Sequence, residues 1–100
     1  MYDLIIKNGL IIDGTGSDAY ISDIGIIGEK ISSISKEITE ESKVVIDAKG
    51  KFVTPGFIDP HSHAEMNVLF YNKCQSLVFQ GVTTFVGGNC GGSAAPVGKY

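Results

Sequence analysis

The two histidines of this 100-residue chain, His61 and His63, lie one residue apart in the stretch FIDPHSHAE. They follow a short apolar run that predicts a buried strand. In extended backbone, residues i and i+2 point to the same side, so both imidazoles can converge on one ion. Neutral imidazole is a good ligand for zinc and other borderline transition metals. The pair therefore indicates a metal site, although His-x-His pairs also occur as ordinary hydrogen-bonded polar residues.

Cys90 is the second group that could bind a metal. It lies in GGNCGGS, directly after another short apolar run that predicts a strand. Thiolate is a strong zinc ligand, and flanking glycines allow the backbone to take unusual dihedral angles. Cys74 falls instead inside a predicted amphipathic helix, where cysteine acts as a small core hydrophobe. We therefore expect Cys90 to join the histidines, the alternative being a free buried cysteine in a flexible loop.

Two parallel strands and a helix must position these three side chains. GFID (56–59) and VTTFVGG (82–88) read as short apolar strands. Residues 64–80 between them carry apolar side chains at helical spacing, and Gly81 is a natural stop. Strand, helix and strand over about 30 residues form a βαβ unit, which requires a parallel sheet. Open α/β sheets and α/β barrels build their active sites at the carboxyl ends of such strands.

The first 54 residues predict a β-rich scaffold that carries no chemistry. Asn8-Gly9, between two isoleucine-rich runs, is the strongest short-range hairpin signal and predicts a type I′ turn. A second hairpin is expected at Gly28-Glu29, and a tight turn at residues 48–50. Four isoleucines are the candidates for inward-facing side chains of this second hairpin: Ile24, Ile26, Ile31 and Ile34.

Composition and charge exclude several classes of protein. Hydrophobic residues make up 43% and charged residues 19%, as in a globular chain and unlike a disordered one. The net charge of −3 offers no basic surface for nucleic acid or an anionic membrane, and no apolar run reaches the length of a membrane span. The N-terminus does not resemble a signal peptide, and two cysteines without an export signal indicate a reducing compartment. We therefore expect a cytoplasmic protein.

Three motifs together resemble the amidohydrolase superfamily. YDLIIKNGLIIDGTG (2–16) is followed by PGFID-x-HSH (55–63), which resembles the superfamily as a whole. GVTT-x-V-x-GNCG-x-S-x-AP (81–96) resembles more specifically its D-aminoacylase branch, the N-acyl-D-amino-acid deacylases. The resemblance covers essentially the whole chain.

This resemblance implies an α/β fold with a β-rich N-terminal part. Residues 1–54 would be the N-terminal segment of a small β-sandwich, and residues 55–100 the first βαβ unit of a (β/α)8 barrel. His61, His63 and Cys90 would bind one or two zinc ions, with Cys90 replacing the carboxylated lysine of many relatives. Glu65, where the branch usually has an aspartate, and Ser93 would contact substrate or support the metal ligands.

The implied activity is hydrolysis of the amide bond of N-acyl-D-amino acids, by water that a metal ion activates. The family needs two further histidines and an aspartate, so the general base is expected beyond residue 100. The chain would then be an N-terminal fragment, inactive alone, that self-associates through its open strand edge or pairs with the rest of the enzyme. Two alternatives stay open: another amidohydrolase such as a dihydroorotase or hydantoinase, and a non-catalytic metal-binding module.

Overall fold

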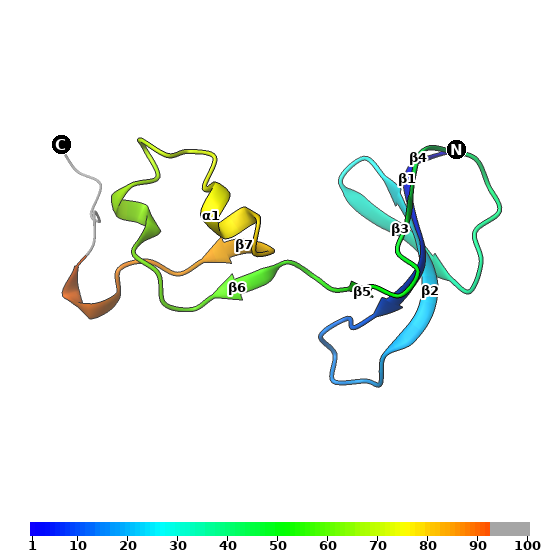
Figure 1. Ribbon diagram of the computed structural model, residues 1–100, viewed down its shortest axis with the longest axis horizontal. Helices are drawn as coiled ribbons and strands as arrows, with labels where there is room; N and C mark the ends of the chain where they lie inside the picture. The colour runs from blue at the N-terminus through cyan, green and yellow to red at the C-terminus, as the bar shows by residue number, and fades with distance from the viewer. Residues whose placement is uncertain (93–100) are drawn as a thin grey trace. The chain divides into compact units, whose positions relative to one another are not determined.

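The structure, a computed structural model, describes residues 1–92, and the chain divides into two compact units, Met1–Pro55 and Gly56–Tyr100. The strands of the first unit are β1 (Tyr2–Ile11), β2 (Tyr20–Ile27), β3 (Lys30–Ser35), β4 (Ser42–Asp47) and β5 (Phe52–Val53) (Figure 1). The elements of the second are β6 (Phe57–Asp59), the 3-10 helix η1 (Ala64–Met66), α1 (Gln75–Val78), β7 (Val82–Phe85) and the 3-10 helix η2 (Asn89–Gly91). None of the helices in the described range has the length and apolar character of a membrane span.

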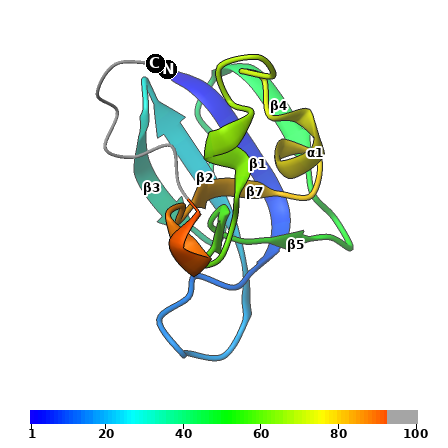
Figure 2. The ribbon, with the colours of Figure 1, turned by 90° about the vertical axis from the view of Figure 1, so that its left-hand side faces the viewer.

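The first unit is one five-stranded sheet with β1 at its centre. The strand order is β3-β2-β1-β4, and β5 also pairs with β1. Figure 2 shows β2 between β1 and β3. β1, β2 and β3 pair antiparallel, and the hairpin predicted at Gly28-Glu29 is confirmed. β4 and β5 both run parallel to β1, and the tight turn between them is closed by the Lys51 amide, which donates to the Ala48 carbonyl (2.9 Å).

The apolar core of the described residues lies entirely in this first unit. It is small and consists of Ile5, Ile11, Ile24, Ile38 and Ala48. Of the isoleucines predicted to face inward, Ile24 is buried and Ile26 half-buried, whereas Ile31 and Ile34 share the same face but are 63% and 46% exposed. They line an open apolar groove of about 260 Å³ on one face of the sheet. The pattern identified the apolar face correctly, but no described element of this unit covers it.

The hairpin predicted at Asn8-Gly9 is wrong, because β1 runs straight through both residues. The register against β2 shifts between Ile6 and Gly9, which marks a β-bulge. Asn8 has the positive φ (60°) that the sequence suggested, but its contacts are with distant residues. Its backbone N–H donates to Asp23 and its side-chain amide to Asp47, both at 2.9 Å. These bonds hold the bulge within a continuous strand.

The second unit has the predicted order of strand, helix and strand, with a shorter helix than predicted. β6 and β7 pair in parallel, with α1 between them along the chain. The continuous helix predicted over residues 64–80 is wrong, because only Ala64–Met66 and Gln75–Val78 are helical. Cys74 has left-handed backbone (φ 44°), which interrupts any helical ladder. Apolar spacing cannot reveal such a break.

Candidate metal centre

The loops that carry the histidines and Cys90 leave the two-stranded sheet at the same edge. β6 and β7 are parallel, with Asp59 opposite Phe85 at their carboxyl ends. Pairing continues beyond the strands: the Val86 N–H donates to the Asp59 carbonyl (2.9 Å), and the Ser62 N–H to the Val86 carbonyl (3.0 Å). The chain after β6 and the chain after β7 are thereby held side by side.

The structure brings His61, His63 and Cys90 together. One ligand atom from each of the three side chains lies within 4.8 Å of the others. The Cys90 Sγ is 3.2 Å from the His61 Nε2, and the two imidazole centroids are 5.6 Å apart, with their rings inclined at 65°. All three side chains are exposed, so the cluster opens to solvent in the described part of the chain.

Short side-chain contacts fix the backbone of the histidine loop. The Asp59 carboxylate accepts a hydrogen bond from the backbone N–H of His61 (3.1 Å), a local turn of a kind that aspartate favours. The Ser62 hydroxyl oxygen accepts from the Ala64 N–H (3.2 Å). Each bond spans two residues, so side chains within residues 59–64 help to fix the backbone that carries the histidines. Sequence reasoning gave Asp59 no role, although an aspartate two residues before a histidine is a common sign of such a turn.

Cys90 sits in a tightly wound loop with left-handed backbone. Gly88 (φ 80°) and Gly91 (φ 71°) adopt this conformation easily because they lack a Cβ. Cys90 itself has φ 57°, which costs a residue with a side chain on the order of 1 kcal/mol. Such strain persists only where neighbouring structure enforces it, and it is concentrated at functional sites. The conformation turns the thiol toward His61.

The donor set fits a zinc ion. Zinc–nitrogen and zinc–sulfur bonds of about 2.0 to 2.3 Å in tetrahedral geometry place ligand atoms about 3.3 to 3.8 Å apart. The observed separations, 3.2 Å for the Cys90–His61 pair and at most 4.8 Å within the cluster, require only small side-chain movements to reach that range. Two imidazoles and one thiol also match the nitrogen and sulfur preference of zinc.

Glu65 contacts the cysteine loop. Its Oε1 accepts a hydrogen bond from the Gly88 N–H (2.9 Å). This bond is the main cause that lowers the pKa of the Glu65 carboxyl, and the nearby His63 adds a smaller effect in the same direction. Glu65 is therefore directed at protein backbone in this unit. Ser93, the other residue predicted to contact substrate or support the ligands, lies outside the described residues.

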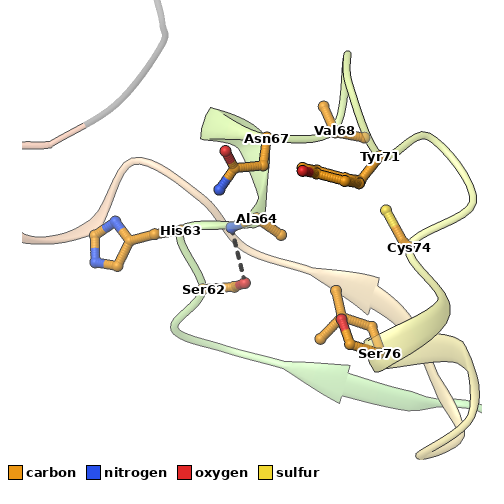
Figure 3. Close-up of a pocket in the computed structure, with 9 residues that line it drawn as sticks. Ser62, His63, Ala64, Asn67, Val68, Tyr71, Cys74 and Ser76 are labelled. Atoms are coloured by element: carbon orange, nitrogen blue, oxygen red, sulfur yellow. Dashed lines mark hydrogen bonds between the residues drawn. The ribbon is translucent and has the colours of Figure 1, made fainter.

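A pocket of the second unit lies beside the histidine loop and has one member of the cluster, His63, in its lining. It has a volume of about 450 Å³ and includes the side chains of Tyr71, Cys74 and Ser76. In Figure 3 the His63 ring points away from these residues. Cys74 is half-buried at the start of α1, so its predicted place inside a long helix is wrong. The prediction that Cys74 is no metal ligand is untested by this geometry.

With this geometry in place, comparison with known proteins identifies the class. The family model for the amidohydrolase family matches residues 44–98, which include all three clustered side chains. The chain belongs to the amidohydrolase family.

Among relatives, the chain is similar to a D-aminoacylase from Alcaligenes xylosoxydans xylosoxydans, with 36% identity over 96% of this chain and 20% of that protein. A solved D-aminoacylase structure, described with a binuclear metal centre, matches with a TM-score of 0.89 and 38% identity, over 96% of this chain and 20% of that one. The N-acyl-D-glutamate deacylase of Bordetella bronchiseptica, complexed with zinc and a phosphonate inhibitor, matches with a TM-score of 0.88 and 40% identity, over 95% and 20%. The chain thus spans about one fifth of the length of the relatives it matches.

Proposed function

We propose that the full protein to which this chain belongs is a zinc-dependent hydrolase of N-acyl-D-amino acids. The observation that carries the proposal is the convergence of His61, His63 and Cys90 at the carboxyl ends of β6 and β7. The similarity to D-aminoacylase and N-acyl-D-glutamate deacylase supports the substrate class. The products would be a carboxylic acid and a free D-amino acid.

The three clustered side chains would hold one or two zinc ions. A bound zinc ion supplies Lewis acidity for attack of water on the amide carbonyl. His61 and His63 would bind through neutral imidazole, and Cys90 as thiolate. None of the three acts as nucleophile or general base in this scheme.

Residues 1–54 would be part of a small β-sandwich domain, and residues 55–100 the start of a (β/α)8 barrel. The match of both units to D-aminoacylase structures supports this division. In such barrels the catalytic residues come from the ends of several different strands. Both histidines of this chain are already in the cluster, so further imidazole ligands and the general base would come from outside these 100 residues. The chain alone would then be inactive, and its open strand edge would favour self-association or pairing with the remainder.

The test is an activity assay of the full-length protein loaded with zinc. Substrates are the N-acetyl derivatives of D- and L-amino acids, with hydantoin and dihydroorotate as the cyclic amides of the rival hydrolases. We expect turnover of the D-acyl compounds. Turnover of cyclic amides alone would replace the proposal with the rival activity, and zinc binding without any turnover would favour a metal-binding module.

A further inference from the structure

The loop that carries Cys90 is fastened to the histidine loop by few contacts. In the described residues, four hydrogen bonds join these segments: Val86 N–H to the Asp59 carbonyl, Ser62 N–H to the Val86 carbonyl, Glu65 to the Gly88 N–H, and Cys90 to His61. The first two lie at the base of the loops, beside the sheet, and the fourth is the cluster itself. The Glu65–Gly88 hydrogen bond is therefore the one support between the base and the cluster.

Gly87 shows how closely the Glu65 carboxylate fits against this loop. A Cβ added to Gly87 would lie 2.7 Å from the Glu65 Cδ, 2.8 Å from its Oε2 and 3.0 Å from its Oε1. The carboxylate thus fills the space that a side chain at position 87 would need, so a larger residue there would have to displace Glu65. Gly88 is different, because its left-handed backbone (φ 80°) requires glycine for conformation.

The second oxygen of Glu65 points to the same role. Oε2 is covered from solvent and has no hydrogen-bond partner among the described residues. It lies over the position of Gly87, so both carboxylate oxygens face the cysteine loop. A carboxylate arranged for substrate would present at least one oxygen to the open side of the site.

We propose that Glu65 is a positioning residue that holds the Gly87–Gly88 segment and so places the Cys90 thiol beside the histidines. The strained backbone of Cys90 needs such enforcement from its surroundings. The loop-holding role stands on the contacts of this chain, and its consequence for metal binding rests on the proposed function.

The first test measures amide hydrogen exchange of the full-length, metal-free protein over residues 86–91. Glu65→Ala removes the acceptor of the Gly88 N–H, and we expect exchange in this segment at least about 10-fold faster. Glu65→Gln keeps an acceptor oxygen and should stay within about 3-fold of the natural protein. Asp3→Ala is the matched control. It also removes a carboxylate that accepts a glycine N–H, that of Gly28 (2.7 Å), but in the first unit, so exchange at 86–91 should stay unchanged. Unchanged exchange at 86–91 in Glu65→Ala would overturn the proposal.

The second test uses cobalt in place of zinc, because bonding of a thiolate to cobalt gives a charge-transfer absorption band. We expect Glu65→Ala to weaken this band and to lower kcat by about 10- to 100-fold with little change in KM. Glu65→Gln should retain the band and the natural kcat. A full-strength band and kcat in Glu65→Ala would overturn the role in placing the thiol. If the natural protein gives no cobalt–thiolate band and no turnover, the proposed function fails, and the exchange result alone decides the loop-holding role.

Gly87→Ala provides a second perturbation that leaves the carboxylate in place. The new methyl group would displace Glu65 and should reproduce the fast exchange at residues 86–91. When Gly87→Ala is combined with Glu65→Ala, the collision disappears. Exchange at residues 86–91 should therefore be no faster in the double variant than in Glu65→Ala alone. Strictly additive effects of the two substitutions would overturn the proposal, because they would show that the two positions act independently.

Discussion

The two units of the chain differ in how far their side chains are buried. The first unit holds all five buried apolar residues of the described chain, and its buried carboxylate, Asp23, accepts the backbone N–H groups of Asn8 and Ile38 (2.9 and 3.0 Å). The described part of the second unit contains no buried residue. There, hydrogen bonds join polar groups of two loops at one edge of a two-stranded sheet, and the three possible metal ligands are exposed.

This difference assigns stability and metal binding to different parts of the chain. In the first unit, an aspartate binds backbone N–H groups to close a core, and no cluster of possible metal ligands is found there among the described residues. In the second, a glutamate binds a backbone N–H to hold a loop that carries a candidate ligand. Substitutions in the first unit should therefore change stability, and substitutions at the edge of the second should change metal binding.

The largest expected effect is that of Cys90→Ala in the full-length protein. A methyl group cannot replace a thiolate ligand, so we expect loss of most bound zinc and a fall in kcat of at least about 100-fold. Metal content by elemental analysis and the deacylase assay measure the two effects. Cys74→Ala is the control, since its half-buried thiol is not among the three clustered ligand atoms and its loss should leave zinc content unchanged. Full zinc content in Cys90→Ala would contradict the proposed ligand set.

Convergence of the three side chains could be predicted from the sequence for a physical reason. Carboxyl ends of neighbouring parallel strands meet at one edge of a sheet, so the chain positions of His61, His63 and Cys90 were enough. That they bind metal stays a prediction. The contact between Glu65 and Gly88 spans 23 residues, and no local pattern indicates which backbone N–H the carboxylate reaches.

The failed predictions involve interactions that periodicity does not encode. Asn8-Gly9 has the local chemistry of a turn, but Asp23 and Asp47 bind Asn8 within a continuous strand that has a bulge there. The side chain of Val53 also occupies the space beside Gly9, so this glycine serves close packing. The long helix failed at Cys74, whose left-handed backbone no apolar spacing reveals.

The next largest effect is expected from Ile5→Ala in the core of the first unit. Ile5 is 1% exposed, and truncation of a buried isoleucine costs about 2–5 kcal/mol through lost burial and the cavity left behind. Native-state hydrogen exchange of the β1 and β2 amides measures this loss. Ile21→Ala, at a position 68% exposed, is the control and should cost much less. If Ile5→Ala released zinc without lowering the protection of these strands, the separation between the units would be wrong.

A smaller loss of stability is expected from Asp23→Ala. The substitution leaves the backbone N–H groups of Asn8 and Ile38 without their acceptor. Only the Ile38 bond is buried, so the expected cost is about 1–3 kcal/mol, the penalty for one buried N–H without a partner. Exchange of these two amides should accelerate along with that of the neighbouring strands. Asp18→Ala, in an exposed loop, should leave the same amides unchanged. Equal protection in Asp23→Ala and Asp18→Ala would show that water replaces the carboxylate without cost.

The smallest expected effect is a pH dependence that arises in the first unit alone. The side-chain amide of Asn8 and the backbone N–H of Lys49 donate to the Asp47 carboxylate and hold its pKa below the ordinary value of 3.8. A carboxyl whose pKa is lower in the folded state stabilises that state above its unfolded pKa, and this stabilisation is lost as the pH falls through the lowered value. Asp47→Asn should therefore lower the urea midpoint slightly at pH 7, and the gap from the natural protein should narrow below about pH 3.8.

The pH comparison has to be made on metal-free protein. Histidine ligands take up protons and release metal in acid, so a zinc-loaded sample would lose stability at the second unit as well. Removing the metal from both proteins confines the difference to Asp47. Glu37→Gln, at an exposed position, should leave the midpoint at both pH values unchanged. A gap of the same size at pH 7 and pH 3 would mean that the effect of Asp47→Asn has nothing to do with the charge that Asn8 and Lys49 stabilise.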